Sequence, residues 1–247
     1  MATESKFHAT LRPEGRILAP EEPLGARMRQ DGGVSSSDSV FRIAVLASGG
    51  GTNLQAIIDR LHGSDGIEVA GVGSDKPDAF ALERARSVLI ETAIFPREDY
   101  PDRDTRDDAM ADWIDSLNAE LVVLAGYMQL VSAGFVERFR YRIINVHPAL
   151  LPAFPGLDAI GQAIDAGVRV TGVTVHFVDE GTDTGPVILQ RPVKVPAGGR
   201  DELEEVIHAV EHEIYPEAIG MIARGRVRIA ADNPRRVIID GPTESTD

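Results

Sequence analysis

The 247-residue sequence predicts an α/β fold in which helices cover both faces of a mostly parallel β-sheet. Two observations favour this class. Before residue 150, short and almost wholly apolar segments alternate with segments whose apolar residues recur at helical spacing, as in a parallel sheet with crossover helices. After residue 150, the strand-like segments alternate between apolar and polar residues, which is typical of antiparallel strands. We therefore expect a second, smaller half with mixed strands.

The first half contains the alternating strands and helices. The apolar segment 41–47 (FRIAVLA) is predicted as the first strand, and the loop SGGGTN follows it. The helix predicted after this loop has an apolar stripe formed by Leu54, Ile57, Ile58 and Leu61. Further strands are predicted at 67–74, 91–95, 120–126 and 142–147. Other helices are predicted at 78–88 and around Met110, Trp113, Ile114 and Leu117.

The second half is predicted as a hairpin followed by a helix. Its strands lie at 173–178 and 186–195. The helix is predicted to begin at Asp201, because Asp201 and Glu204 occupy the two positions of a capping box. Its apolar stripe consists of Leu203, Val206, Ile207, Val210 and Ile214.

The two ends of the chain are predicted as tails. Residues 1–39 mix Pro, Gly, Glu and Arg without apolar periodicity, so we expect them to be disordered. We expect one folded domain at 40–235, divided into halves at about residue 140, and a C-terminal tail at 236–247.

Charge and composition exclude several classes of function. The net charge of −14 argues against nucleic acid as a general partner, because phosphate backbones repel an acidic surface. The absence of cysteine excludes disulfides, zinc–thiolate sites and cysteine nucleophiles. No apolar run approaches the roughly 20 residues of a membrane span, and the N-terminus lacks the apolar centre of a signal peptide. The expected location is the cytoplasm, with no membrane partner.

The glycine loop between the first strand and the first helix is a candidate anion site. It does not match a dinucleotide fingerprint, because Leu54 stands where the last glycine of G-x-G-x-x-G is needed, and it lacks the Gly-Lys-Ser/Thr of a Walker loop. Backbone N–H groups near Gly51, with Thr52 and Asn53, would instead suit a phosphate monoester at a helix N-terminus. The alternative is a plain tight turn in which Asn53 only caps the helix.

A polar pair ends the fifth predicted strand. Asn145 and His147 are two residues apart, so strand alternation places them on the same face. Pro148 restricts the backbone of His147, and later prolines stiffen the loop; Leu151–Pro152 is the candidate cis bond. This arrangement favours two hydrogen-bonding side chains held at one point. The alternative is a capped strand end with a satisfied histidine.

The loop 179–186 (DEGTDTGP) offers a carboxylate to this pair. An acidic surface turn is the ordinary fate of such residues, and the loop becomes relevant only if a carboxylate reaches His147. An amide, an imidazole and a carboxylate without a nucleophilic side chain suit acyl or formyl transfer to an amine. Asn145 and His147 would then stabilise negative charge on oxygen, and Asp183 would help the amine lose its proton.

Five motifs resemble the phosphoribosylglycinamide formyltransferases of purine biosynthesis: SGGGTNLQAI, VVLAGYMQLVS, NVHPALLPAFPG, TGVTVHFVDEGTDTGPVILQ and EHEIYP. The resemblance covers about residues 41–230. It implies the formyltransferase fold, in which a Rossmann-like nucleotide-binding half joins a smaller folate-binding half. It also implies transfer of the formyl group from 10-formyltetrahydrofolate to the amine of N1-(5-phospho-D-ribosyl)glycinamide, with no metal required.

The resemblance implies a role for each matching residue. The catalytic residues would be Asn145, His147 and Asp183. The phosphate-binding residues would be Gly51, Thr52 and Asn53, and Glu211 would contact the rest of the phosphorylated substrate. The folate-binding residues would be Arg97, Met128, Gln129, Leu130, Val131 and Asn145. The sequence departs from its relatives at Gln129, where arginine is common, and at Asp158, where histidine is common.

Three other functions compete with this interpretation. Formyltetrahydrofolate deformylase shares the three catalytic residues but usually carries a regulatory domain ahead of its core. Methionyl-tRNA formyltransferase shares the loop after the histidine but has a further C-terminal domain and needs basic surface. A non-catalytic folate or nucleotide binder is the third alternative. The oligomeric state is left open between monomer and homodimer.

Overall fold

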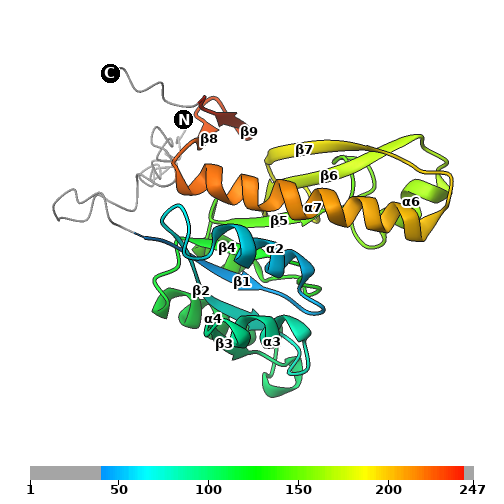
Figure 1. Cartoon of the computed structure of the whole chain (residues 1–247). Helices are drawn as coiled ribbons and strands as arrows, with labels where there is room; N and C mark the ends of the chain where they lie inside the picture. Colours follow the sequence, from blue (N-terminus) through cyan, green and yellow to red (C-terminus); the bar gives the residue numbers. More distant parts are fainter. Residues whose placement is uncertain (1–39, 242–247) are drawn as a thin grey trace, which may run out of the picture.

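Apolar segments of the first half form five parallel strands in the computed structural model, which describes residues 40–241 (Figure 1). These strands are β1 (Phe41–Leu46), β2 (Ile67–Ser74), β3 (Glu91–Ile94), β4 (Leu121–Leu124) and β5 (Ile143–His147). Apart from the edge strand β3, their residues are almost all buried, which explains their apolar sequences. The predicted N-terminal tail and residues 242–247 lie outside the described residues.

The strand order places a switch point beside the glycine loop. The seven-stranded sheet has the order β3-β2-β1-β4-β5-β6-β7, so the chain builds outward from β1 in one direction and then, from β4 onward, in the other. In open α/β sheets, ligands bind outside the carboxyl ends of the strands at such a point. The ends of β1, β4 and β5 are therefore where a site is expected.

The last two strands of the sheet confirm the predicted change of character. Strands β6 (Val170–Phe177) and β7 (Val187–Lys194) are antiparallel to each other, and β6 is antiparallel to β5. The pairing of β5 with β6 places Asn145 opposite His176 and His147 opposite Thr174.

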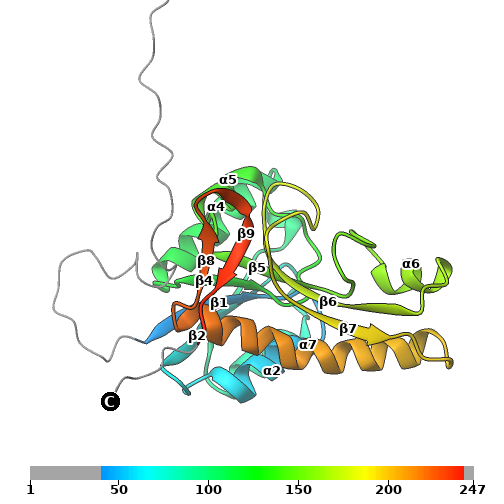
Figure 2. The same ribbon diagram turned by 90° about the horizontal axis from the view of Figure 1, so that it is seen from above.

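Helices cover the two faces of the sheet unequally (Figure 2). One face packs against α2 (Thr52–Leu61), α3 (Phe80–Ser87) and α7 (Arg200–Ala223). The other packs against α4 (Arg103–Ser116) and α5 (Ala133–Arg138). The remaining helical segments are the 3-10 turn η1 (Arg97–Asp99) and the short α6 (Ala159–Asp165).

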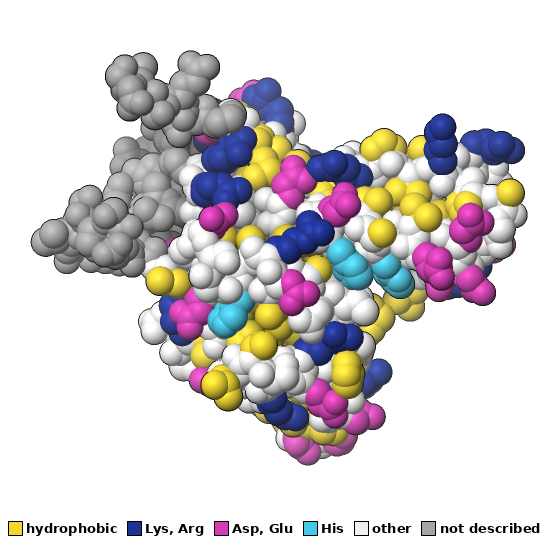
Figure 3. Space-filling view, viewed as in Figure 1, with side chains coloured by type: hydrophobic (Ala, Val, Ile, Leu, Met, Phe, Trp, Pro, Cys, Tyr) yellow, Lys and Arg dark blue, Asp and Glu magenta, His cyan; other side chains and the backbone are white. Residues whose placement is uncertain are grey.

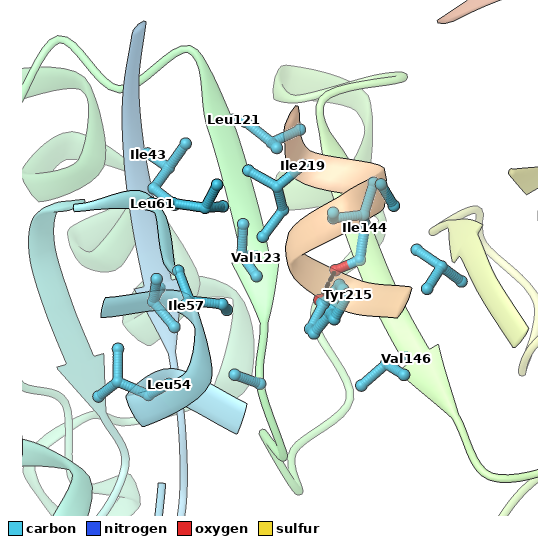
Figure 4. Close-up of a cluster of buried hydrophobic side chains, with 14 of the residues drawn as sticks. Ile43, Leu54, Ile57, Leu61, Leu121, Val123, Ile144, Val146, Tyr215 and Ile219 are labelled. Carbon is cyan, nitrogen blue, oxygen red and sulfur yellow. Dashed lines mark hydrogen bonds between the residues drawn. The ribbon is translucent and has the colours of Figure 1, made fainter. Parts of the chain in front are cut away.

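Each face has its own hydrophobic core. The core under α2 and α7 contains the residues labelled in Figure 4: Ile43, Leu54, Ile57, Leu61, Leu121, Val123, Ile144, Val146, Tyr215 and Ile219. The Tyr215 hydroxyl lies 2.9 Å from the Leu124 carbonyl oxygen and 3.0 Å from that of Ile144, so α7 is joined to both β4 and β5. The core under α4 and α5 includes Met110, Ile114, Phe135 and Phe139.

The predicted start of the last helix is wrong. Helix α7 begins at Arg200 after Gly199, and no side chain caps it, so Asp201 and Glu204 do not form a capping box. Gly199 has φ of 91° and ψ of −152°, a conformation that glycine adopts readily, and it starts the helix one residue earlier. Glu202 instead accepts a hydrogen bond of 2.8 Å from the N–H of Gly198.

A C-terminal hairpin extends the fold beyond the predicted boundary at residue 235. Strands β8 (Val227–Ala230) and β9 (Asn233–Ile239) pair antiparallel and form a separate two-stranded sheet. The sequence analysis does not predict this hairpin. The alternation of apolar and polar residues in VRIA (227–230) and RRVII (235–239) is too short to distinguish a strand from a loop. Within residues 40–241, no helix has both the length and the apolar character needed to cross a membrane.

Candidate active site

The glycine loop connects β1 to α2 at the carboxyl edge of the sheet. Gly51 precedes the helix with φ of 68°, and a Cβ atom there would lie 2.8 Å from the Cα of Ala81. Both facts require glycine at this position. The carbonyl groups of Gly49 and Gly50 accept hydrogen bonds from Ala81 N–H and the Arg84 side chain, which anchors the loop. The first-turn N–H groups of α2, which have no partners inside the helix, are left for an anion.

Asn53 links this loop to the C-terminal half. Its side chain does not cap α2, because Gly51 is the N-cap and no side-chain cap is present. Instead, Asn53 Nδ2 donates to Glu211 Oε2 of α7 at 2.9 Å, while Asn53 Oδ1 is buried without a hydrogen-bond partner. Burial raises the pKa of the Glu211 carboxyl, although the bond from Asn53 and the nearby His208 oppose that shift. The structure thus brings two of the predicted substrate-binding residues together.

The predicted catalytic residues meet at the end of β5. His147 is 4% exposed, and its Nδ1 lies 3.3 Å from Asp183 Oδ2. Asn145 Nδ2 lies 3.4 Å from His176 Nε2, and that nitrogen is in turn 3.6 Å from Asp183 Oδ1. The prediction that a carboxylate of the 179–186 loop reaches His147 is confirmed.

Backbone groups of the proline-rich loop complete this cluster. The peptide bond between Leu151 and Pro152 is cis, as predicted. His147 Nε2 lies 2.8 Å from the carbonyl oxygen of Phe154, and the N–H of Gly156 donates to Asp183 Oδ2 at 2.7 Å. Both nitrogens of the His147 ring therefore face acceptor oxygens.

Asp183 is held in its ionised form by its neighbours. Burial opposes ionisation, but the contact with His176, the hydrogen bond from Gly156 and the nearby His147 outweigh it, so the pKa of Asp183 lies below its usual value. At neutral pH the carboxylate can therefore accept a proton or hold a cationic neighbour.

The segment after β4 lies beside the glycine loop. The N–H of Met128 donates to Ser48 Oγ at 2.8 Å, and Gln129 Nε2 donates to Asp75 Oδ2 at 3.0 Å. Met128 and Leu130 are 62% and 67% exposed, which leaves apolar surface at this edge. The strip Met128–Val131, predicted to bind folate, follows β4 and thus lies between β1 and the predicted catalytic residues at the end of β5.

Two other predicted features lie apart from the cluster. Arg97 begins η1 and is exposed, and the described residues show no hydrogen bond or ion pair between it and the strip Met128–Val131. Asp158, a departure from the relatives, caps α6 by accepting from the N–H of Gly161 and pairs with Arg200 at 2.7 Å. These contacts show how its loop is anchored. Between residues 40 and 241, no group of three or more potential metal ligands is arranged to hold an ion.

His176 was missed by the sequence reasoning. It is 2% exposed, its Nδ1 lies 2.8 Å from the carbonyl oxygen of Phe177, and its other nitrogen faces Asn145 and Asp183. The motif VTVHFV contains it, but only the pairing of β6 with β5 brings it to the cluster.

Comparisons with known proteins show the family to which this chain belongs. The formyl transferase family model matches residues 41–219. A phosphoribosylglycinamide formyltransferase of Haemophilus influenzae is 44% identical over 192 residues, which cover 76% of this chain and 90% of that protein. The trifunctional purine biosynthetic protein adenosine-3 of Drosophila melanogaster is 40% identical over 195 residues, which cover 77% of this chain and only 14% of that protein.

A solved structure agrees as well. The structure of glycinamide ribonucleotide transformylase 1 from Symbiobacterium toebii has a TM-score of 0.78 and 44% sequence identity, and the match covers 86% of this chain and all of that one. Since the family model matches well over half of the chain, and the Haemophilus influenzae and Symbiobacterium toebii proteins are matched over 90% and all of their lengths, this chain belongs to the formyl transferase family.

Proposed function

We propose that this chain transfers the formyl group of 10-formyltetrahydrofolate to the amine of N1-(5-phospho-D-ribosyl)glycinamide, a step of purine biosynthesis. The observation that carries the proposal is the contact of His147 with Asp183, with Asn145 on the same strand face, at the sheet edge that holds the glycine loop. The names of the relatives support the choice of substrates.

The glycine loop is the proposed phosphate site. The N–H groups at the start of α2 would bind the phosphate oxygens, with the Thr52 hydroxyl as a further donor. Glu211 of α7 accepts a hydrogen bond from Asn53 at the start of α2, so it lies next to this phosphate site. It would contact the sugar or the amide of the substrate. Strands β1 and β5 are separated only by β4, so the loop and the catalytic cluster lie roughly 10 Å apart, a span that a ribosyl glycinamide can bridge.

The strip Met128–Val131 is the proposed site for the formyl donor. Its exposed apolar side chains, Met128 and Leu130, and its backbone outside any strand or helix suit a flat heterocycle with donors and acceptors along one edge. The donor supplies an activated formyl group at the end of β5. Neither a metal nor ATP enters the proposed reaction.

The proposed chemistry gives a role to each of the three side chains. The amine nitrogen forms a bond to the formyl carbon, and the bond from that carbon to N10 of the donor breaks. The Asn145 amide and the His147 imidazole would stabilise negative charge that develops on the formyl oxygen, with His147 Nε2 exchanging its contact with the Phe154 carbonyl for that oxygen. The Asp183 carboxylate would take up the proton that the amine loses, and N10 of the leaving folate gains one proton.

A direct assay tests the proposal. Purified protein is mixed with 10-formyltetrahydrofolate in EDTA buffer without ATP, with and without phosphoribosylglycinamide. Tetrahydrofolate formation is followed by absorbance, and the formylated product by mass spectrometry. We expect turnover only when the amine is present.

Consumption of the formyl donor at the same rate without the amine would instead identify a deformylase. Both reactions need the same three residues, so these residues do not favour the deformylase over the transferase.

Within the proposal, the chain acts in the cytoplasm as a monomer or homodimer, and sedimentation at assay concentrations distinguishes the two. Figure 3 shows the face over α2 and α7, where acidic and basic side chains are interspersed, which agrees with a small-molecule substrate rather than nucleic acid.

A further inference from the structure

The C-terminal hairpin contacts the loop that carries Asp183. Arg235 of β9 donates a hydrogen bond from its guanidinium to the carbonyl oxygen of Thr184, the residue directly after Asp183. These residues are 51 positions apart in the sequence, and the hairpin forms a sheet separate from the one that carries the predicted catalytic residues.

The conformation of this loop needs support. Asp183 has φ of 54°, in the left-handed region that non-glycine residues rarely adopt. Gly185 has no space for a side chain, because a Cβ atom there would lie 1.8 Å from the carbonyl oxygen of Phe177. Holding Asp183 in this conformation costs free energy, which the contacts of its neighbours must offset.

Thr184 is held by two side chains. Its hydroxyl donates to Asp179 Oδ1 at 2.6 Å, and the same oxygen accepts from the N–H of Gly181 at 3.1 Å. Its carbonyl accepts from Arg235. Asp183 lies directly before this doubly held residue.

A cavity of about 330 Å³ borders the loop that carries Asp183. Its lining includes residues 178–181 and Pro186 of the loop region, Val136 of α5, and Pro234 and Arg235 of the hairpin. Because side chains do not fill this space, packing there constrains the loop less, and its polar contacts matter more for its position.

We propose that Arg235 is a positioning residue for catalysis, which keeps the Asp183 carboxylate in contact with His147 and His176 by holding Thr184. The inference rests on the proposed function, since it assigns Arg235 to the same reaction. It also gives the hairpin a role, because Arg235 connects the C-terminal end of the fold to the catalytic carboxylate.

The test compares Arg235→Ala with Arg236→Ala in the transfer assay. Arg236 is the neighbouring exposed arginine on β9, but it pairs with Asp232 of the hairpin at 2.6 Å and makes no described contact with the loop. We expect Arg235→Ala to lower kcat roughly threefold to tenfold, the effect of losing one charge-assisted hydrogen bond, and to leave KM for both substrates within about twofold. Arg236→Ala should keep the wild-type kcat.

Two further variants separate positioning from folding. Arg235→Lys keeps one charged donor and should recover at least about half of the lost kcat. Asp179→Ala removes the other side-chain contact of Thr184 and should lower kcat in the same manner as Arg235→Ala. Thermal midpoints of all variants are measured, so that the assay is run where each one is folded.

Specific outcomes would overturn the inference. A kcat for Arg235→Ala equal to that of Arg236→Ala would do so, as would a rise in KM with unchanged kcat, or failure of Arg235→Lys to recover turnover. If the unaltered protein transfers no formyl group, the proposed function fails instead, so the two failures are distinguishable.

Discussion

At the scale of single residues, Asp183 is central because it is the residue that the other polar groups of the site contact. His147, His176 and the N–H of Gly156 all approach its two oxygens, at 3.3 Å, 3.6 Å and 2.7 Å respectively. Together they hold its pKa low despite its burial. A neutral amide at this position would keep the size of the side chain but lose the charge that accepts the proton.

We therefore expect Asp183→Asn and His147→Ala each to lower kcat well over tenfold in the transfer assay, as loss of a positioned acid–base or oxyanion group does. The matched control is Glu180→Gln, an exposed carboxylate in the same loop, which should keep wild-type turnover. Circular dichroism confirms that the variants are folded. Near-normal rates in both catalytic variants would contradict the mechanism.

At the scale of elements, the site is made where strands end. The glycine loop precedes α2 after β1, the strip Met128–Val131 follows β4, and the polar pair Asn145 and His147 ends β5. Parallel neighbours share their carboxyl edge, so three loops that are distant in sequence meet. Gly51 then allows the chain to enter α2 with its N–H groups directed at this edge.

For α2, we expect Thr52→Ala to raise KM for the phosphorylated amine by roughly fivefold to thirtyfold, because a hydroxyl donor to a charged phosphate is lost while the backbone donors remain. KM for the formyl donor and kcat should change little. Thr52→Ser keeps the hydroxyl and serves as the control. Steady-state kinetics with each substrate varied in turn decide the matter; a selective rise in KM for the formyl donor would show that the loop binds the other substrate.

At the scale of the whole molecule, α7 joins the two halves of the sheet. Its Tyr215 hydroxyl lies within hydrogen-bond distance of carbonyl oxygens on β4 and β5, and its Glu211 reaches α2 through Asn53. Tyr215 itself is fully buried, at 0% exposure. The relative placement of the glycine loop and of strands β4 and β5 therefore depends on this helix.

We expect Tyr215→Phe to reduce the free energy of unfolding by about 1–3 kcal/mol, because a buried carbonyl would lose its hydrogen-bond donor. The aromatic ring keeps the packing, so kcat should stay within about twofold of wild type. Urea denaturation at equilibrium measures the change. An unfolding free energy equal to that of the wild type would mean that the hydroxyl contributes nothing to the join between α7 and the sheet.

Local patterns in the sequence were sufficient for the strands of the main sheet, most of the helices, the glycine loop and the polar pair. Each of these depends on residues close together in the chain: a run of apolar residues, a helical stripe, or an alternation that places Asn145 and His147 on one face. A local pattern also explains the wrong prediction for the start of α7. Asp201 and Glu204 have the spacing of a capping box, but the backbone conformation of Gly199 starts the helix before them.

Only the tertiary structure decided which distant residues meet. The pairing of β5 with β6 brings His176 opposite Asn145, the packing of α7 brings Glu211 to Asn53, and the hairpin brings Arg235 to Thr184. Sequence periodicity reports which side of an element is buried, because burial follows from the element's own geometry. It does not say which strands pair or where a helix packs, since these depend on contacts between segments that the chain separates by many residues.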